Sequence, residues 1–334
     1  MSDRFAGEYV LPLRWADDSA ADELTAHLEK LSSWIDVTVV DGSAPALYER
    51  HSARWSHIVR HLSPDPRPGG NGKVAGVMTG VARARHERVI LGDDDVRYEK
   101  AELGRVLRAL ETWHVVRPQN YFTTLPWHAR WDTARTLVNR AFGSDYPGTL
   151  GVRRSVLLGA GGYDGDVLFE NLELIRTVRA AGGRELRADD LFVARRPPDP
   201  HHFLHQRVRQ AYDDFAQPWR LAAELAILPL AIWAARRPRR LLLLFALACL
   251  VAERGRRRAG GTAVFPITSA LWAPAWLAER AVCVWIAVAT RMRGGVSYGG
   301  TRLRQAATPL RILRQTVPHM TEHRNGHRTS HDPT

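Results

Sequence analysis

Three short apolar runs, each separated from the next by a polar or helical stretch, constrain the fold of this chain more than any other feature. The runs are residues 9–13, 35–40 and 89–92, and helical patterns occupy residues 22–33 and 73–85. Strands that alternate with helices are typical of an α/β layer architecture with a mostly parallel sheet. We therefore predict such a sheet for the first half of the chain.

Acidic residues follow two of these predicted strands directly. Asp41 comes after the second strand and the run Asp93, Asp94 and Asp95 comes after the third. In open α/β sheets, ligands bind beyond the carboxyl ends of the strands, where the strand order changes. We expect these carboxylates to converge on one crevice.

The acidic triplet after the third strand has two interpretations. Three adjacent carboxylates repel one another unless a cation lies among them, and Mg²⁺ or Mn²⁺ is usually held through one or two carboxylates and substrate phosphates. In an extended segment Asp93 and Asp95 point the same way, so that one can hold the ion and the other a ligand hydroxyl. The alternative is an acidic turn in which Asp95 begins a helix over residues 99–110.

A second polar segment precedes this triplet. Asn71, Gly72 and Lys73 open the helical pattern of residues 73–85, roughly 20 residues before the acidic triplet. Backbone N–H groups at a helix start, together with a lysine, can receive a phosphate. Taken alone, the segment is equally explained as an ordinary loop with a solvated lysine.

The order of these motifs resembles family 2 glycosyltransferases with the GT-A nucleotide-diphospho-sugar transferase fold. The resemblance covers about residues 8–215 and is carried by segments 10–12, 40–43, 72–73, 78–80, 89–97, 148–155, 161–164 and 169–174. It implies a Rossmann-like catalytic domain that binds a nucleotide-diphospho-sugar donor.

The resemblance also implies roles for single residues. Asp41 would contact the nucleotide base or ribose, and Lys73 would lie near the nucleotide. Asp93 would bind the sugar-nucleotide, and Asp95, with Asp93 as a second candidate, would ligate Mg²⁺ or Mn²⁺ across the diphosphate. Such a cation stabilises the negative charge of a departing nucleoside diphosphate. The implied donor-binding residues are Pro12, Asp41, Ser43, Gly72, Lys73, Asp93, Asp94, Gln206 and Arg209.

The expected catalytic base departs from the family pattern. An inverting transferase needs a base that deprotonates the acceptor hydroxyl, and in this family the base is usually the aspartate of a Glu-Asp pair. This chain has Glu170 followed by Asn171, and an asparagine cannot accept the proton. Glu170 is the favoured base, with Asp164 and Asp166 as alternatives. Glu170 is also explained as a carboxylate stabilised by the start of a helix over residues 170–181.

A further departure concerns chain polymerisation. Gln206 and Arg209 match a QxxRW element of processive polysaccharide synthases, but Gln210 replaces its tryptophan. Arg209 can still bind a diphosphate through two parallel hydrogen bonds. We therefore expect transfer of a single sugar.

The positive charge of the chain is concentrated in its last third. The net charge of +12 is of the kind found in nucleic-acid-binding proteins, but residues 1–215 carry 29 basic and 30 acidic side chains, whereas residues 216–334 carry 18 and 5. The excess thus lies outside the sugar-nucleotide motifs. We expect an anionic membrane surface as its partner and no nucleic acid.

Three apolar segments, residues 221–235, 241–252 and 263–290, lie in this basic region. Arginines stand at every junction between them, and each junction prefers the cytoplasmic side of a membrane. Successive single spans would place some junctions on the wrong side, so we predict helices that lie in the interface or enter as hairpins. One alternative is a membrane-spanning helix within residues 263–290. Another is a soluble helical subdomain that packs on the catalytic domain. Residues 301–315 read as a basic surface helix.

The sequence therefore predicts a catalytic domain over residues 1–215, membrane-associated helices over 216–293 and a basic, partly disordered tail over 294–334. The start of the chain shows no secretory signal pattern, so we expect the catalytic domain on the cytoplasmic side. The predicted function is transfer of a hexose to a lipid-linked or cell-envelope glycan acceptor at the cytoplasmic membrane face. The alternatives are a catalytically impaired sugar-nucleotide-binding protein and a basic membrane-surface scaffold.

Overall fold

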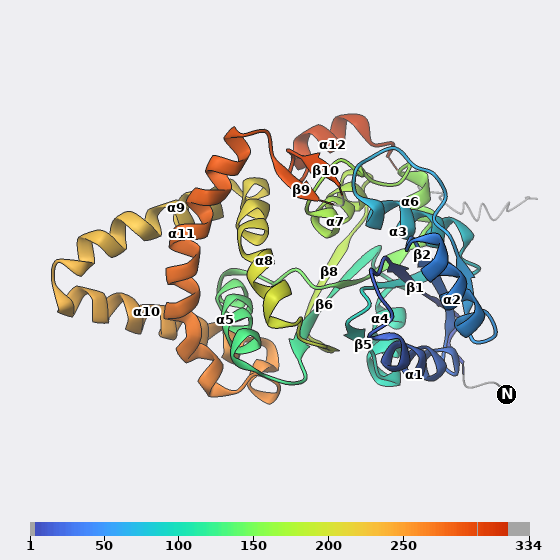
Figure 1. Ribbon diagram of the computed structural model, residues 1–334, viewed down its shortest axis with the longest axis horizontal. Coiled ribbons are helices and arrows are strands. Elements are labelled where there is room, and N and C mark those ends of the chain that lie inside the picture. Colours follow the sequence, from blue (N-terminus) through green and yellow to red (C-terminus); the bar gives the residue numbers. More distant parts are fainter. Residues whose placement is uncertain (1–3, 299, 320–334) are drawn as a thin grey trace, which may run out of the picture.

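A single large sheet organises the first two thirds of the chain. The computed structural model describes residues 4–298 and 300–319 (Figure 1). Within these residues, eight strands join in the order β3-β2-β1-β4-β7-β6-β8-β5. The strands are β1 (Glu8–Leu13), β2 (Asp36–Asp41), β3 (Arg60–Leu62), β4 (Arg88–Gly92), β5 (Val96–Arg97), β6 (Val115–Phe122), β7 (Thr149–Arg153) and β8 (Glu185–Arg195).

The sheet is parallel in its first half and mixed in its second. The strands β3, β2, β1 and β4 are all parallel neighbours. The strand β7 is antiparallel to both β4 and β6, and β5 is antiparallel to β8, whereas β6 and β8 are parallel. The predicted α/β class is therefore confirmed. The chain passes outward from β1 to β3 and returns on the other side of β1 at β4, which creates the expected change in strand order.

Helices cover both faces of this sheet. They are α1 (Ala21–Ser32), α2 (Pro45–Trp55), α3 (Gly72–Arg83), α4 (Lys100–Ala109), α5 (Trp127–Phe142), α6 (Arg154–Gly159), α7 (Glu170–Ala180) and α8 (Pro200–Tyr212). Along β1, Tyr9 and Leu11 pack with α1 and α4, whereas Val10 packs with α3, α6 and α7. Both faces of β1 are buried, which explains its continuous apolar run.

A close contact fixes helix α3 on the sheet. A Cβ atom on Gly80 would lie only 2.2 Å from Cγ1 of Val10, so that any other residue would push α3 away from β1. Since α3 begins beside the carboxyl ends of β1 and β2, this contact positions the start of the helix against the crevice.

Some elements were not predicted from the sequence. The helix α2 and the short strand β3 lie between Ser43 and the polar loop of residues 63–72. The residues Leu47, His51 and Trp55 of α2 are buried at intervals of four, a helical signal that was available. Of the alternatives for the acidic triplet, a helix that begins at Asp95 is wrong, because Glu99 caps α4 and residues 96–97 form β5. Asp94 and Asp95 do form a turn, in which the backbone N–H of Val96 donates to the backbone oxygen of Asp93.

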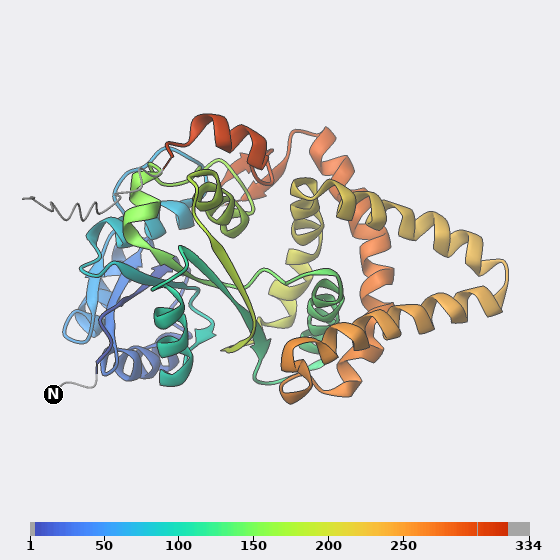
Figure 2. The same cartoon turned by 180° about the vertical axis from the view of Figure 1, so that it is seen from behind.

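Beyond the sheet, two helices form a projecting hairpin. Helices α9 (Pro218–Ala235) and α10 (Pro238–Arg257) extend from one end of the molecule, and α11 (Ala273–Met292) crosses their base (Figures 1 and 2). Short 3-10 turns, η2 (Arg258–Ala263) and η3 (Ile267–Trp272), join α10 to α11. By length and composition, two helical segments can cross a membrane, Pro218–Ala235 and Ile267–Met292.

The eight-stranded sheet and the helices α1 to α8 that cover it are called the sheet domain. The base of the α9–α10 hairpin packs on this domain, while the outer part of the hairpin is exposed. Ala248 and Ala252 of α10 share a core with Leu137 of α5 and Trp276 of α11. The exposed large apolar side chains of α9 and α10 are Trp219, Leu230, Ile232, Trp233, Leu242, Leu243, Phe245, Leu247 and Leu250.

The chain then returns to the sheet domain. A small hairpin, β9 (Val296–Tyr298) and β10 (Thr301–Leu303), precedes helix α12 (Leu310–Thr316), which packs against α7. The predicted helix over 301–315 is thus corrected, because Leu303, Ala306 and Ala307 are drawn into a core with Leu168 and hold this segment extended. The disorder predicted for the tail concerns residues 320–334, which lie outside the described residues. The boundaries predicted for the three regions stay a prediction.

Candidate functional site

A large cavity lies beyond the carboxyl ends of β1, β2 and β4. Its volume is about 1090 Å³, which is at the upper end of the size usual for ligand pockets. The loops after these strands and the starts of α3 and α7 form its walls, and α8 and α11 also contribute side chains. Among the predicted site residues, those that line it are Pro12, Gly72, Lys73, Asp93, Asp94, Asp95, Glu170, Gln206 and Arg209.

Lys73 links two carboxylates inside this cavity. Its Nζ atom lies 2.6 Å from Oδ1 of Asp93 and 2.7 Å from Oε1 of Glu170. The side chain of Asn71 accepts a hydrogen bond from the Lys73 backbone N–H and so caps α3. Glu170 is the first residue of α7, where a carboxylate is also favoured by the helix dipole. Two helix starts therefore bring together three predicted residues from distant parts of the chain.

This contact shifts the pKa values of Lys73 and Glu170, whereas burial outweighs Lys73 at Asp93 and raises the pKa of that carboxyl. Burial would lower the pKa of Lys73, but the charges of Asp93 and Glu170 outweigh it and raise that pKa above its usual value. Burial would raise the pKa of Glu170, but Lys73 and Arg209 outweigh it and lower that pKa. Glu170 is therefore an ionised partner of Lys73 and a weak proton acceptor.

The carboxylates of Asp94 and Asp95 are held by separate partners. The Nε1 atom of Trp15 donates to Oδ2 of Asp94 at 2.5 Å, and Nε of Arg195 donates to Oδ2 of Asp95 at 2.7 Å. The other oxygen of Asp95, Oδ1, is buried, and it has no hydrogen-bond partner among residues 4–298 and 300–319. Gly148 leaves room for Asp93, since a Cβ atom there would lie 2.7 Å from Oδ2 of Asp93.

The residues present fit one divalent cation. Asp95 forms part of the cavity wall and its enclosed Oδ1 atom has no hydrogen-bond partner in the described residues, while Asp93 lies two residues away in the same wall. Within the described ranges, no group of three or more histidine, cysteine or acidic side chains can hold a metal. Mg²⁺ and Mn²⁺ are commonly bound through one or two carboxylates together with substrate phosphates and water, which matches this donor set.

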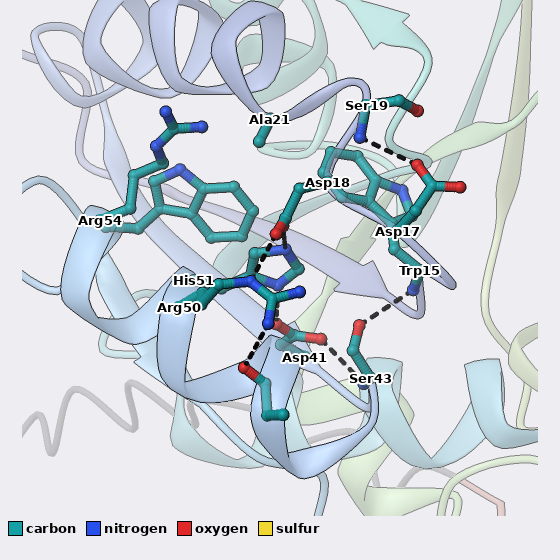
Figure 3. Close-up of polar contacts among 12 residues, drawn as sticks. Trp15, Asp17, Asp18, Ser19, Ala21, Asp41, Ser43, Arg50, His51 and Arg54 are labelled. Carbon is teal, nitrogen blue, oxygen red and sulfur yellow. Dashed lines mark hydrogen bonds and ion pairs between the residues drawn. The ribbon is translucent and has the colours of Figure 1, made fainter.

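Asp41 lies apart from the other predicted donor-binding residues. Its side chain is buried at the end of β2, where Oδ2 lies 2.6 Å from Nδ1 of His51 (Figure 3). The same oxygen lies 3.2 Å from Nε2 of His61. Nε2 of His51 in turn lies 2.9 Å from Oδ1 of Asp18. The carboxylate of Asp41 is thus satisfied inside the protein and does not line the cavity.

Ser43 links Asp41 to the loop that follows β1 and contains Trp15. Its backbone N–H donates to Oδ1 of Asp41, and its Oγ atom accepts the backbone N–H of Trp15 at 2.9 Å (Figure 3). Because Trp15 also donates to Asp94, this chain of hydrogen bonds connects Asp41 to the acidic triplet.

The two alternative bases lie outside the cavity lining. Asp164 accepts the backbone N–H of Asp166, and Oδ1 of Asp166 accepts the backbone N–H of Gly70. Both carboxylates are exposed and stabilise the loops beside α3. Asn171 lines the cavity, but its Nδ2 atom donates to the backbone oxygen of Pro147 at 2.9 Å, which ties α7 to the segment before β7.

The cavity wall also contains charged residues that were not predicted from the sequence. The 3-10 turn η1 (Asp213–Ala216) contributes Asp213 and Asp214, and α11 contributes Arg280, which pairs with Asp214 at 3.0 Å. Arg209 places its guanidinium 4.5 Å from the centre of the Tyr298 ring. The sequence signal for this group was weak, because acidic residues in an apolar region stand out only once α8, α9 and α11 are packed together.

Similarity to known proteins is confined to structure. No family model matches the chain, and no match was found among curated proteins. A mannosyltransferase, PcManGT from Pyrobaculum calidifontis, in complex with GDP-Man and Mn²⁺, is 16% identical, covers 84% of this chain and 87% of its own, and has a TM-score of 0.47. S. aureus TarS is 14% identical, covers 62% of this chain and 64% of its own, and has a TM-score of 0.43. Glucosyl-3-phosphoglycerate synthase from Mycobacterium tuberculosis is 18% identical, covers 60% of this chain and 73% of its own, and has a TM-score of 0.37.

Proposed function

We propose that this protein is an inverting, metal-dependent glycosyltransferase that uses a nucleotide-diphospho-sugar donor. The observation that carries the proposal is the contact of Lys73 with Asp93 and Glu170 beside the unpaired Oδ1 of Asp95, all in one cavity at the carboxyl ends of parallel strands. Such a site offers both a cation and a metal ligand to a diphosphate, at the place where open α/β sheets bind nucleotides.

Different residues of the cavity would bind the donor phosphates, contact the sugar and orient the metal ligand. The start of α3 and the ammonium group of Lys73 face the cavity, where they attract the donor phosphates. The carboxylate of Asp93, held by Lys73, can accept a hydrogen bond from a sugar hydroxyl. Arg209, which also lines the cavity and whose charge acts on Glu170, adds a second positive group for the diphosphate. Arg195 holds Asp95 in a fixed orientation.

The proposed Mg²⁺ or Mn²⁺ ion would be held by Asp95, with Asp93 as a further ligand, and would stabilise the negative charge of the leaving diphosphate. Arg195 leaves one oxygen of Asp95 available for this role. Transfer of a single hexose fits Gln210, which lines the cavity where a processive synthase has tryptophan.

The proposed acceptor is a lipid-linked or cell-envelope glycan precursor at the cytoplasmic face of a membrane. Support comes from the hairpin of α9 and α10, which exposes many large apolar side chains and whose tip carries Arg236, Arg237, Arg239 and Arg240. Apolar side chains beside arginines are typical of helices that lie in an anionic membrane interface.

A donor panel tests the proposed activity. Purified protein is incubated with GDP-mannose, UDP-glucose and UDP-GlcNAc in the presence of Mn²⁺ or Mg²⁺, and release of nucleoside diphosphate is measured with and without EDTA. We expect release from at least one donor, and we expect EDTA to abolish it. Absence of release from a wider panel of sugar nucleotides would exclude a glycosyltransferase.

A catalytically impaired sugar-nucleotide-binding protein is a second candidate, favoured by Asn171. The side chain of Asn171 serves the Pro147 backbone and cannot accept a proton. Donor binding by calorimetry without turnover, in both the wild type and Asn171→Asp, would support this candidate. A basic membrane-surface scaffold would show neither binding nor turnover.

A further inference from the structure

The proposed reaction lacks an evident proton acceptor, and the following inference rests on that proposed function. Inversion requires that the acceptor hydroxyl lose its proton as it attacks. Asn171 cannot accept it, and Glu170 is held 2.7 Å from the ammonium group of Lys73, whose charge keeps it ionised. The exposed carboxylates of Asp164 and Asp166 do not line the cavity. A different group must therefore act.

Asp213 has the geometry that these residues lack. It is the first residue of η1, directly after α8, and it lines the same cavity as Glu170 and Arg209. Its Oδ1 atom is buried and has no hydrogen-bond partner in the described part of the chain. A buried carboxylate oxygen left without a donor is uncommon, because an unmade hydrogen bond costs stability. Asp213 as a whole is only half-buried and forms part of the cavity wall, so a substrate in the cavity lies against this residue although its Oδ1 atom is enclosed.

Charged groups from four helices surround this carboxylate. They are Arg209 of α8, Glu170 of α7, Arg280 of α11 and Arg220 of α9. Burial is the largest influence and Glu170 adds to it, and together they outweigh the three arginines and raise the pKa of Asp213 to about 7. A base with a pKa near the working pH combines availability with proton affinity.

We propose that Asp213 is the catalytic base, and that its carboxylate takes the proton of the acceptor hydroxyl. In this step the acceptor oxygen forms a bond to the anomeric carbon, and the bond between that carbon and the β-phosphate oxygen breaks. The electron pair of the broken bond leaves with the nucleoside diphosphate, and the proton ends on Asp213. No other reactant is required.

The variant Asp213→Asn tests this assignment because it keeps the shape of the side chain and removes its basicity. The donor that the wild type turns over is supplied with either water or octyl glucoside as acceptor, and nucleoside diphosphate release is measured from pH 5.5 to 9. We expect the wild-type rate to rise about tenfold per pH unit below about pH 7, because protonated Asp213 cannot accept a proton. In the variant we expect a loss of about 100-fold or more at pH 8 and no such rise.

Two comparisons separate a catalytic role from a structural one. Donor affinity, measured by calorimetry, should stay within about threefold of the wild type in Asp213→Asn. The matched control Asp190→Asn removes an exposed carboxylate that pairs with Arg105 on the surface and should keep both the rate and the pH profile. A rate in Asp213→Asn within about threefold of the wild type, with the pH profile unchanged, would overturn the assignment while leaving the proposed function intact. Wild-type protein that releases no nucleoside diphosphate would overturn both.

Thermal unfolding gives a second readout that does not depend on turnover. The raised pKa of Asp213 means that ionising it in the folded protein costs stability, and this loss develops as the pH rises from about 4 towards 7. Asparagine cannot ionise, so Asp213→Asn should have a higher Tm than the wild type at pH 8, and the difference in Tm should be smaller at pH 5. A variant that is equally destabilised at both values would contradict the assignment, because it would show that the carboxylate only supports the fold.

Discussion

The sheet domain and the α9–α10 hairpin use the same apolar residue types in opposite ways. In the sheet domain Leu28 and Leu31 are fully buried, whereas in the hairpin Leu242 and Leu243 are 66% and 68% exposed and Trp219 is 91% exposed. Burial of apolar side chains stabilises a fold, while a contiguous exposed set marks a surface that contacts something else. The difference teaches that the α9–α10 hairpin buries much less of its apolar surface within this chain than the sheet domain does.

Charged side chains are paired inside the sheet domain but unpaired and exposed at the tip of the hairpin, within the residues that the structure describes. In the sheet domain Lys73 and Arg195 pair with carboxylates of the cavity. At the tip of the hairpin Arg236, Arg237 and Arg239 are exposed and form no ion pair within the part of the chain that the structure describes. Paired charges hold a site in one geometry, and unpaired exposed charges act on a partner of opposite sign.

The largest effect is expected from Asp95→Asn. This change keeps an oxygen for Arg195 but removes the negative charge proposed to hold Mg²⁺ or Mn²⁺, so we expect nucleoside diphosphate release to fall about 1000-fold. Release is measured at saturating donor and metal. Glu111→Gln, which alters an exposed carboxylate paired with Arg88, is the matched control. A rate that stays close to the wild type would show that the carboxylates of the sheet domain serve only its fold.

The exposed leucines of the hairpin should give the next largest effect. Replacing both Leu242 and Leu243 with serine removes apolar area from the surface, and we expect binding to vesicles that contain anionic lipid to weaken about 100-fold. Sedimentation with the vesicles measures binding. Turnover in the absence of lipid should not change, because these residues lie away from the cavity. Unchanged vesicle binding would break the comparison and favour a protein partner for the hairpin.

Asp41→Asn tests whether the charges of the sheet domain support folding. Burial would raise the pKa of Asp41, but hydrogen bonds from His61, Ser43 and His51 outweigh it and lower that pKa. Its stabilisation is therefore present above about pH 4 and lost as the pH falls below that value. Urea unfolding should show a loss of about 2 kcal/mol at pH 7 and a smaller loss at pH 3. An equal loss of unfolding free energy at pH 7 and pH 3 would show that the charge of Asp41 does not contribute to stability.

The smallest effect is expected from Arg239→Gln at the tip of the hairpin. Removing one exposed positive charge should weaken binding to anionic vesicles about fivefold at low salt and much less at high salt. The free energy of unfolding should not change, in contrast to Asp41→Asn. Weaker binding that persists at high salt would show that Arg239 acts through packing and not through its charge.

The sequence by itself determined the local features of the protein. The order of strands and helices around β1, β2 and β4 follows from apolar runs and helical periodicity, which are properties of neighbouring residues. The cavity residues Lys73, Asp93, Asp95 and Glu170 were also predictable, because each lies at the end of a strand or the start of a helix. For the apolar segments between the arginines, the sequence predicted helices that lie in the interface or enter as hairpins, without deciding between them.

Only the tertiary structure decided how these side chains are used. His51 and His61 enclose Asp41 because α2 and β3 pack beside β2, and Arg195 reaches Asp95 from a strand that lies 100 residues further along the chain. Asp213 enters the cavity because α8, α9 and α11 close around η1. The charge state and the free hydrogen-bonding positions of a buried group depend on whatever surrounds it in space, and sequence patterns describe only neighbours along the chain.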